Sequence, residues 1–285
     1  MENLRIGIQR SGRLSEKSLE LLKESGISLA NGSRKLLSAS QNFPLEALYL
    51  RDDDIPQYVF DRVTDLGIVG ENVVREKGHD LRIVERLGFA RCRMSIALPK
   101  NVEYNGIKQL DGKRIATTYP NILSDFLEKN SLDAEIHVIS GSVEIAPGIG
   151  LADAIFDIVS TGSTLISNGL REVEVVMESE AVIVANSELS KGKQETLEKL
   201  LFRMRAVRKS RDNKYILLNA PNESLDEIIK VIPGMKSPTV MPLAEKGWSS
   251  VHSVLNENEF WEIIDRLREL GAQGILVIPI EKMIT

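Results

Sequence analysis

The sequence predicts an α/β protein with two lobes, followed by a small α+β domain. Segments typical of strands and helices alternate from residue 4 to about residue 80, and the alternation starts again at Arg93. From residue 213 the order becomes strand, helix, strand, strand, helix, strand, which is the ferredoxin-like plan. Because alternating strands and helices favour parallel sheets with covering helices, we expect a largely parallel sheet in each lobe.

The first lobe is expected to begin with a strand at 4–9 and a helix at 15–25. Ser15 is a suitable N-cap for this helix, and Gly26 supplies the conformational freedom that a helix end needs. The remaining elements are expected to be strands at 47–50 and 66–69, and helices at 55–61 and 72–77.

The second lobe is expected to contain strands at 94–98, 114–117, 135–139, 156–159 and 173–179, and helices at 120–129, 148–154 and 164–168. A strand at 181–185 then leads to a long helix at 191–212, whose apolar residues recur at helical spacing. These residues are Leu197, Leu200, Leu201, Met204 and Val207. The chain is therefore expected to return to the first lobe after about residue 180.

Three domains follow from this order. We expect lobe I at 1–92 plus 180–212, lobe II at 93–179 and the C-terminal domain at 213–285. The last domain is expected to have strands at 214–219, 239–243, 248–255 and 274–279, and helices at 225–231 and 259–270. Two α/β lobes with a returning chain are similar to periplasmic binding proteins, so the cleft between the lobes is the expected ligand site.

Composition narrows the class of protein. The chain has 285 residues, of which 42% are hydrophobic and 27% are charged, as in ordinary globular proteins. A net charge of -5 argues against nucleic acid as the main partner. No segment approaches the roughly 20 apolar residues that span a membrane, and the N-terminus lacks the apolar stretch of a signal peptide. With Cys92 as its single cysteine, the chain is expected in the cytoplasm.

The most informative segment is DAIFDIVSTGSTL at 153–165. A buried strand is followed by a turn that contains only hydroxyl residues and glycine, namely Ser160, Thr161, Gly162, Ser163 and Thr164. Backbone N–H groups at such a turn form a concavity that suits a phosphate group. Asp153 and Asp157 are placed to face ribose hydroxyls or a magnesium ion. The segment predicts a phosphorylated sugar as ligand; an ordinary helix N-cap is the alternative.

Other polar residues fall into three groups. Arg13, with Gly12 and Arg10, lies in a short turn between a strand and a helix, where a guanidinium can bind phosphate. Three widely separated histidines show no metal-ligand spacing and are interpreted as structural; they are His79, His137 and His252. The acidic run 52–54 is interpreted as a solvated turn at a helix N-terminus.

The stretch 144–173, which includes EIAPGIGLAD and DIVSTGSTL, resembles the long-form ATP phosphoribosyltransferases of histidine biosynthesis. Further matching stretches are RIGIQRSGRLS at 5–15, RDDDIP at 51–56, DLGIVGEN at 65–72, GKRIATTYP at 112–120 and IEKM at 280–283. The resemblance thus covers essentially the whole chain in the expected order. Other ribose-phosphate transferases usually place two adjacent acids before the hydroxyl turn, whereas Asp157 here is followed by Ile158 and Val159, which favours the ATP-specific family.

The resemblance implies transfer of the phosphoribosyl group of phosphoribosyl pyrophosphate to N1 of ATP, with release of pyrophosphate. The implied catalytic residues are Glu144, Asp157 and Arg13. The implied phosphoribosyl pyrophosphate site consists of Asp153, Ser160, Thr161, Gly162, Ser163 and Thr164. The implied ATP site consists of Arg10, Gly12, Asp65, Gly67, Gly70, Glu71 and Tyr119. Tyr119 either packs on the adenine or is an ordinary tyrosine at the edge of the core.

The resemblance also implies a cofactor, an effector and an assembly. Mg²⁺ is expected to bind mainly through the substrate, and its direct protein ligands stay open. The C-terminal domain is expected to be an ACT-like regulatory domain that binds histidine. Thr239, Met241 and Ala272 are expected to contact the effector because of their positions at the ends of strands and helices. A homo-oligomer, a hexamer in exchange with dimers, is implied. A non-catalytic solute-binding protein and a transcriptional effector-binding module are the alternative classes, and no helix-turn-helix precedes the lobes.

Overall fold

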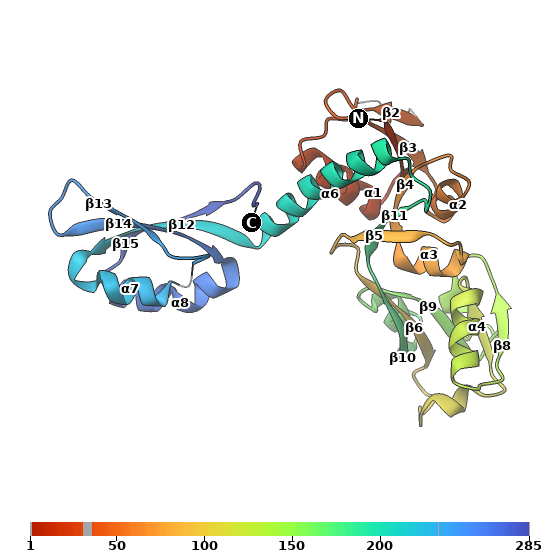
Figure 1. Cartoon of the computed structure of the whole chain (residues 1–285). Helices are drawn as coiled ribbons and strands as arrows, with labels where there is room; N and C mark the ends of the chain where they lie inside the picture. Colours follow the sequence, from red (N-terminus) through yellow and green to blue (C-terminus); the bar gives the residue numbers. More distant parts are fainter. Residues whose placement is uncertain (1, 31–35, 233, 285) are drawn as a thin grey trace. The chain divides into compact units, whose positions relative to one another are not determined.

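The computed structural model describes residues 2–30, 36–232 and 234–284 (Figure 1). Contacts divide the chain into two compact units. The first unit contains residues up to 20 and 27–197, and the second contains 21–26 and 198 onward. Each unit has its own hydrophobic core and is described by itself.

The first sheet of the first unit has six strands in the order β2-β3-β1-β4-β11-β5. Its strands are β1 Leu4–Gln9, β2 Leu37–Ala39, β3 Leu45–Leu50, β4 Leu66–Gly70, β5 Arg82–Arg86 and β11 Ala181–Ala185. The associated helices are α1 Arg13–Glu24, the 3-10 turn η1 Asp52–Asp54, α2 Ile55–Phe60 and α3 Glu71–Lys77. Strands β1, β3 and β4 are parallel, so their carboxyl ends lie at one edge of the sheet.

The second sheet has five strands in the order β10-β6-β9-β7-β8. They are β6 Cys92–Pro99, β7 Arg114–Thr117, β8 Glu135–Val138, β9 Ala154–Val159 and β10 Leu170–Ser179. The helical segments are η2 Ile107–Leu110, α4 Pro120–Lys129, η3 Val143–Ile145 and α5 Ser163–Ser167. Fully buried Phe156 packs in a core with Ile122, Leu123 and Leu127 of α4, which fixes α4 against the sheet.

The chain passes from the first sheet to the second after β5 and returns between β10 and β11. The start of α3 binds the returning segment through buried polar contacts. The backbone N–H of Asn72 donates to Ser179 Oγ at 3.1 Å, and Ser179 Oγ donates to Asn72 Oδ1 at 3.0 Å. The N–H of Glu71 donates to the carbonyl oxygen of Glu180 at 3.0 Å. The domain boundaries at 92, 180 and 212 stay a prediction.

Helix α6, Lys191–Arg211, precedes the C-terminal sheet, and the five apolar residues predicted to line it are buried. The sheet comprises β12 Asn213–Pro221, β13 Thr239–Pro242, β14 Trp248–Asn256 and β15 Gln273–Pro279, in the order β13-β14-β12-β15 with antiparallel neighbours. Helices α7 Leu225–Val231 and α8 Glu257–Glu269, with the 3-10 turn η4 Asn222–Ser224, complete the βαββαβ order.

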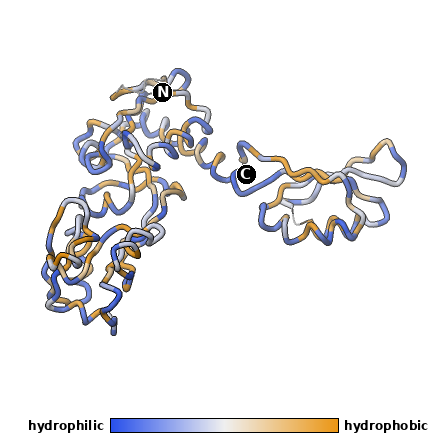
Figure 2. Tube along the Cα trace, turned by 180° about the vertical axis from the view of Figure 1, so that it is seen from behind, coloured by the Kyte–Doolittle hydropathy of each residue, from blue (hydrophilic) through white to orange (hydrophobic). Residues whose placement is uncertain are grey.

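Figure 1 shows α7 and α8 on the same face of this sheet. Ile216, Leu218 and Val251 of the strands pack with Phe260 and Leu267 of α8, and Figure 2 shows hydrophobic stretches along the strands. The predicted class is confirmed: two α/β lobes are followed by a ferredoxin-like α+β domain.

The structure corrects several expectations about single elements. Residues 148–154 form turns and the start of β9 instead of a helix, because Gly150 has a positive φ of 75° and Gly148 adds flexibility. Helix α1 begins at Arg13, so Ser15 lies inside the helix and is not its N-cap. Strands β2 and β5 were not predicted. The sheets are mixed rather than largely parallel, since β11 and β6 pair with their neighbours in antiparallel fashion.

Candidate active site

The predicted phosphate turn follows β9, whose parallel neighbour is β7. Carboxyl ends of adjacent parallel strands lie at the same edge of a sheet, which is where α/β proteins bind ligands. The turn 160–164 at the end of β9 and Tyr119 after β7 therefore belong to one edge. Asp157 lies in the last half of β9, and the charge of its half-buried side chain acts on Tyr119.

The turn has the features of an anion-binding loop. Gly162 adopts a φ of +79°, and Ser160, Thr161, Ser163 and Thr164 are exposed. The hydroxyl groups of Thr161 and Ser163 lie 3.1 Å apart. Helix α5 begins directly after Gly162, so its first backbone N–H groups face the turn. Hydroxyl and amide donors are thus available to a ligand at this place.

A partly buried ion pair between Arg93 and Glu172 lies beside the first residue of the turn. Arg93 Nη1 donates to the carbonyl oxygen of Ser160 at 3.3 Å. The same guanidinium forms a bidentate pair with Glu172, which also accepts from Ser95 Oγ at 2.6 Å. The pKa of Glu172 is lowered, chiefly because its carboxylate accepts hydrogen bonds from Arg93. Sequence reasoning missed Arg93, Ser95 and Glu172, because their contact depends on strand register.

Asp157 and Glu144 form a pair of carboxylates without a cation. Burial raises the pKa of Asp157, and the charge of Glu144 raises it further, against the effect of a hydrogen bond from the Ile158 N–H at 2.7 Å. Within the described residues, neither carboxylate has a positively charged partner. The two carboxylates therefore concentrate negative charge next to the hydroxyl turn.

Tyr119 connects this edge with the acidic turn of the first lobe. Burial raises the pKa of the half-buried Tyr119 phenol, and the carboxylates of Asp157, Asp53 and Asp52 raise it further. The acids of η1 therefore act electrostatically on the same place as Asp157. Sequence reasoning noticed the run 52–54 but set it aside as a solvated turn, since its proximity to Tyr119 requires the fold.

Arginines follow two parallel strands of the first lobe at their carboxyl ends. Arg10, Gly12 and Arg13 follow β1, and Arg51 follows β3. The Arg10 N–H donates to the carbonyl oxygen of Leu50 at 2.8 Å, which ties the two strand ends together. These arginine side chains are exposed and form no ion pair within the part of the chain that the structure describes. Gly12 has a φ of +95°, which glycine adopts without strain.

Two predicted site residues, Asp153 and Asp65, lie at the amino ends of their strands, opposite to the carboxyl ends that carry the candidate site. Asp153 precedes β9, a six-residue strand of roughly 20 Å, so it lies far from the turn that follows β9. Its carboxylate pairs with Arg114 at 3.3 Å, and this contact lowers the pKa of Asp153. Asp65 precedes β4 and binds Lys193 Nζ at 2.7 Å and the N–H of Arg5 at 2.9 Å. The structure does not bring either residue to the candidate site.

Gly67, Gly70 and Glu71 have structural surroundings. A Cβ atom on Gly67 would lie 2.4 Å from Ile55 Cγ2, so glycine allows α2 to pack on β4. A Cβ atom on Gly70 would lie 2.4 Å from Asn72 Oδ1. Buried Glu71 pairs with Arg86, which lowers the pKa of the Glu71 carboxyl. The two glycines therefore allow close packing, and the carboxylate of Glu71 is occupied by its ion pair.

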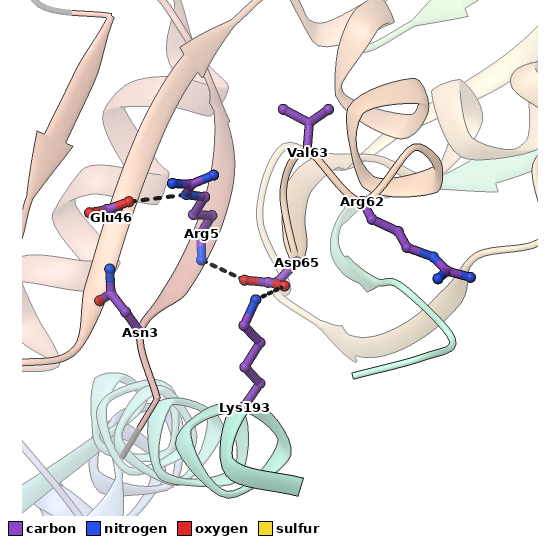
Figure 3. Close-up of a pocket in the computed structure, with 7 residues that line it drawn as sticks. All are labelled: Asn3, Arg5, Glu46, Arg62, Val63, Asp65 and Lys193. Carbon is purple, nitrogen blue, oxygen red and sulfur yellow. Dashed lines mark hydrogen bonds and ion pairs between the residues drawn. The ribbon is translucent and has the colours of Figure 1, made fainter. Parts of the chain in front are cut away.

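A pocket of about 220 Å³ lies at the amino ends of β1 and β4 (Figure 3). It is lined by Asn3, Arg5, Glu46, Arg62, Val63, Asp65 and Lys193. Figure 3 shows the Lys193 side chain and the backbone N–H of Arg5 meeting the Asp65 carboxylate, with the Arg5 guanidinium directed toward Glu46 and Arg62 directed away from them. Arg5 also pairs with Glu46 at 3.1 Å. The positive and negative side chains that line this pocket compensate one another. The pocket also lies at the end of the sheet opposite to Arg10, Arg13 and Arg51, so it is not the candidate site.

The predicted effector residues do not form one cluster within the C-terminal domain. Thr239 and Met241 lie on the same face of β13 and are exposed. Ala272 is buried in the core and immediately precedes β15, at the other edge of the sheet. Three strand spacings separate the edges, which amounts to roughly 14 Å.

The described residues contain no group of three or more His, Cys, Asp or Glu side chains placed to hold a metal ion. Two carboxylates, Asp157 and Glu144, still suit a magnesium ion that brings most of its ligands from a substrate. Among the described helices, none has both the length and the apolar character of a membrane-spanning segment.

Fold and site together define a two-lobed α/β protein with an exposed hydroxyl turn at a strand end and a ferredoxin-like C-terminal domain. The model of the ATP phosphoribosyltransferase family matches residues 51–206, and the model described as HisG, C-terminal domain, matches residues 210–282. The ATP phosphoribosyltransferase of Bacteroides thetaiotaomicron is 62% identical over 281 residues, which is 99% of each chain. That of Cytophaga hutchinsonii is 59% identical, over 99% of this chain and 98% of the other.

A chain in the ATP phosphoribosyl transferase (HisG:HisZ) complex from Thermotoga maritima has a TM-score of 0.63 and 31% identity. The match covers 72% of this chain and 98% of that chain. This chain belongs to the ATP phosphoribosyltransferase family, and it is an enzyme of the glycosyltransferase type. Its match to the C-terminal domain model identifies it as a long form.

Proposed function

We propose that the enzyme transfers the phosphoribosyl group of phosphoribosyl pyrophosphate to N1 of ATP, as the first step of histidine biosynthesis. The observation that carries the proposal is the exposed hydroxyl turn 160–164 beside Asp157 and Glu144, two carboxylates without a cationic partner among the described residues. Family membership supplies the substrates. The biosynthetic role also favours the cytoplasm as the compartment.

In the proposed reaction, the bond between the anomeric carbon and the pyrophosphate oxygen breaks, and a bond from the adenine N1 to that carbon forms. Positive charge develops on the ribose ring as pyrophosphate departs. The carboxylates of Asp157 and Glu144 stabilise this charge, because a nearby positive charge attracts both carboxylates and offsets the cost of ionising Asp157, whose pKa is raised by burial and by Glu144. The adenine nitrogen is the nucleophile, so no protein nucleophile is needed.

The phosphates are bound at the two strand-end loops. The hydroxyl and amide groups of Thr161, Gly162, Ser163 and Thr164, with Ser160 at the start of the turn, bind the 5′-phosphate. The guanidinium of Arg13, with Gly12 and Arg10, binds pyrophosphate or ATP phosphates and neutralises the leaving group. Tyr119 packs on the adenine at the edge between these loops. Asp153, Asp65, Gly67, Gly70 and Glu71 have structural roles in this scheme.

A magnesium ion bound together with the substrate would supply charge neutralisation of the leaving group. Asp157 and Glu144 are the residues that would contact it or its water ligands. We assign both carboxylates to the ribose side of the ligand, where their orienting role on the sugar does not depend on direct coordination.

We also propose inhibition by histidine through the C-terminal domain and a hexamer in exchange with dimers. The match of residues 210–282 to the C-terminal domain model supports a regulatory module. Thr239 and Met241 form the exposed part of the proposed effector site, whereas Ala272 contributes through the core. A chain ending at residue 212 should lose inhibition by histidine and also lose stability, because the carbonyl oxygen of Glu281 accepts from Ser210 at 2.9 Å. Inhibition that persists in this truncated chain contradicts the assignment.

The activity is tested by incubating the full chain with ATP, phosphoribosyl pyrophosphate and MgCl₂ and following the ultraviolet absorbance of the N1 adduct together with pyrophosphate release. Equal amounts of both products are expected, with none when either substrate is left out. Isothermal titration that detects binding of both substrates, without any product, would instead identify a non-catalytic binding protein.

A further inference from the structure

Helix α4 receives its N-terminal cap from a different lobe. Tyr119 is the N-cap residue and provides no capping side-chain bond, and Pro120 follows at the first helical position. The backbone N–H groups of Asn121 and Ile122 donate to the two carboxylate oxygens of Glu76, each at 3.0 Å. Asn121 Nδ2 also donates to the carbonyl oxygen of Glu76 at 2.8 Å. A carboxylate at this place satisfies two free N–H groups and matches the helix dipole.

Glu76 is held in place by its own helix. Figure 1 shows α3 beside α4, and Glu76 lies in the last turn of the seven-residue α3. The first turn of α3 is bound to the lobe connection through Asn72 and Ser179 and through Glu71 and Arg86. Because α3 is fixed at its start, Glu76 presents its carboxylate to α4 from a defined position.

We propose that Glu76 is a positioning residue, which sets the place of Tyr119 by capping α4 from the first lobe; this inference rests on the proposed function. Tyr119 directly precedes the two capped amides, and its phenol lies among the charges of Asp157 and the acidic turn of η1. Loss of the cap allows the first turn of α4 to fray. The ring that packs on the adenine then loses its fixed position, while the hydroxyl turn after β9 keeps its contacts.

The experiment compares the full-length Glu76→Ala variant with the wild type in two measurements. Hydrogen exchange should accelerate by about fivefold to tenfold at the amides of Asn121 and Ile122, the factor that a lost helix cap costs. The KM for ATP should rise by about fivefold, with the KM for phosphoribosyl pyrophosphate changed less than twofold. Glu76→Gln keeps the length of the side chain and one acceptor oxygen, so both effects should be smaller. Asp125→Ala, which removes an exposed acid from the same helix, should change neither.

A double variant distinguishes action through Tyr119 from a general loss of stability. If Glu76 acts through Tyr119, adding Glu76→Ala to Tyr119→Ala should not raise the KM for ATP further. Additive effects on this KM, or unchanged exchange at Asn121 and Ile122 in Glu76→Ala, would overturn the inference. A wild-type chain that makes no adduct would refute the proposed function instead, and the exchange measurement would still test the cap.

Discussion

The guanidinium of Arg93 holds the carbonyl oxygen of Ser160, 3.3 Å from Nη1. The C=O and N–H of a trans peptide point in opposite directions, so this contact directs the N–H of Thr161 away from Arg93. The bidentate pair with Glu172 fixes the guanidinium in turn. Arg93 thereby orients the first amide of the turn that we assign to the 5′-phosphate.

Replacing Arg93 by Met should weaken binding of phosphoribosyl pyrophosphate. We expect its KM to rise about tenfold, as for a lost hydrogen bond to a charged group, with the KM for ATP nearly unchanged. Steady-state kinetics with each substrate varied in turn measure the difference. Arg171→Met removes an exposed charge from the same lobe and serves as the control. Equal increases in both KM values would contradict the role of Arg93.

Asp157→Asn should lower kcat by about 100-fold, which is typical for loss of one electrostatic contact to a transition state. The isosteric amide cannot stabilise positive charge on the ribose.

Thr161→Ala removes a hydroxyl donor of the turn and should lower kcat/KM for phosphoribosyl pyrophosphate by about tenfold. Circular dichroism checks that both variants are folded. Wild-type kinetics in two folded variants would refute the site assignment.

Asp157 should also make the folded state less stable at neutral pH than a neutral residue would. Its folded-state pKa is raised by burial and by Glu144, so the folded protein holds the proton more tightly than the unfolded chain. The contribution of Asp157 to stability is therefore favourable below the ordinary pKa of an aspartate and is lost as the pH rises through the raised pKa. Asp157→Asn should raise the melting temperature at pH 8, and the gain should shrink toward pH 4. A variant that is less stable at pH 8 would contradict this.

Local patterns predicted the elements whose signal lies within a few residues. Apolar residues at helical spacing predicted α6, and they are buried. Gly26, which was predicted to close the first helix, follows the end of α1 and has a φ of +72°. The hydroxyl turn after β9 was also predicted, because its composition alone identifies it. Strand β5 was missed, since its charged residues at an edge of the sheet give no apolar pattern. The prediction of a helix at 148–154 was wrong, because Gly148 and Gly150 disfavour a helix there and Gly150 has a positive φ.

The relation between distant residues could not be predicted from local patterns. Asp153 and Asp157 are four positions apart in sequence, yet Asp153 lies before β9 and pairs with Arg114, whereas Asp157 faces the site. Which end of a strand carries the ligand depends on the direction of the strand in the sheet. The contacts of Glu76 with α4 and of Arg93 with Ser160 join residues 45 and 67 positions apart. Only the tertiary fold determines them.

The connection between the lobes should depend on the pair of Glu71 and Arg86. Glu71 is buried, and among the described residues removal of Arg86 leaves its carboxylate with Arg75 as its one cation, more distant at 3.6 Å. Because Arg86 is half exposed, we expect Arg86→Met to lower the free energy of unfolding by about 1–3 kcal/mol, less than for a fully buried pair. Arg62→Met serves as the control, because it breaks the exposed ion pair with Glu188. This variant should change the free energy of unfolding by less than about 0.5 kcal/mol.

The pH dependence gives this prediction a second test. Arg86 lowers the folded-state pKa of Glu71, so the pair stabilises the protein above the ordinary pKa of a glutamate. The stabilisation is lost as the pH falls through the lowered pKa of Glu71. The difference in unfolding free energy between wild type and Arg86→Met, measured by urea denaturation, should therefore be full at pH 7 and decrease in acid. A difference that stays constant down to pH 3, or is absent at pH 7, would show that the lobe connection does not depend on this ion pair.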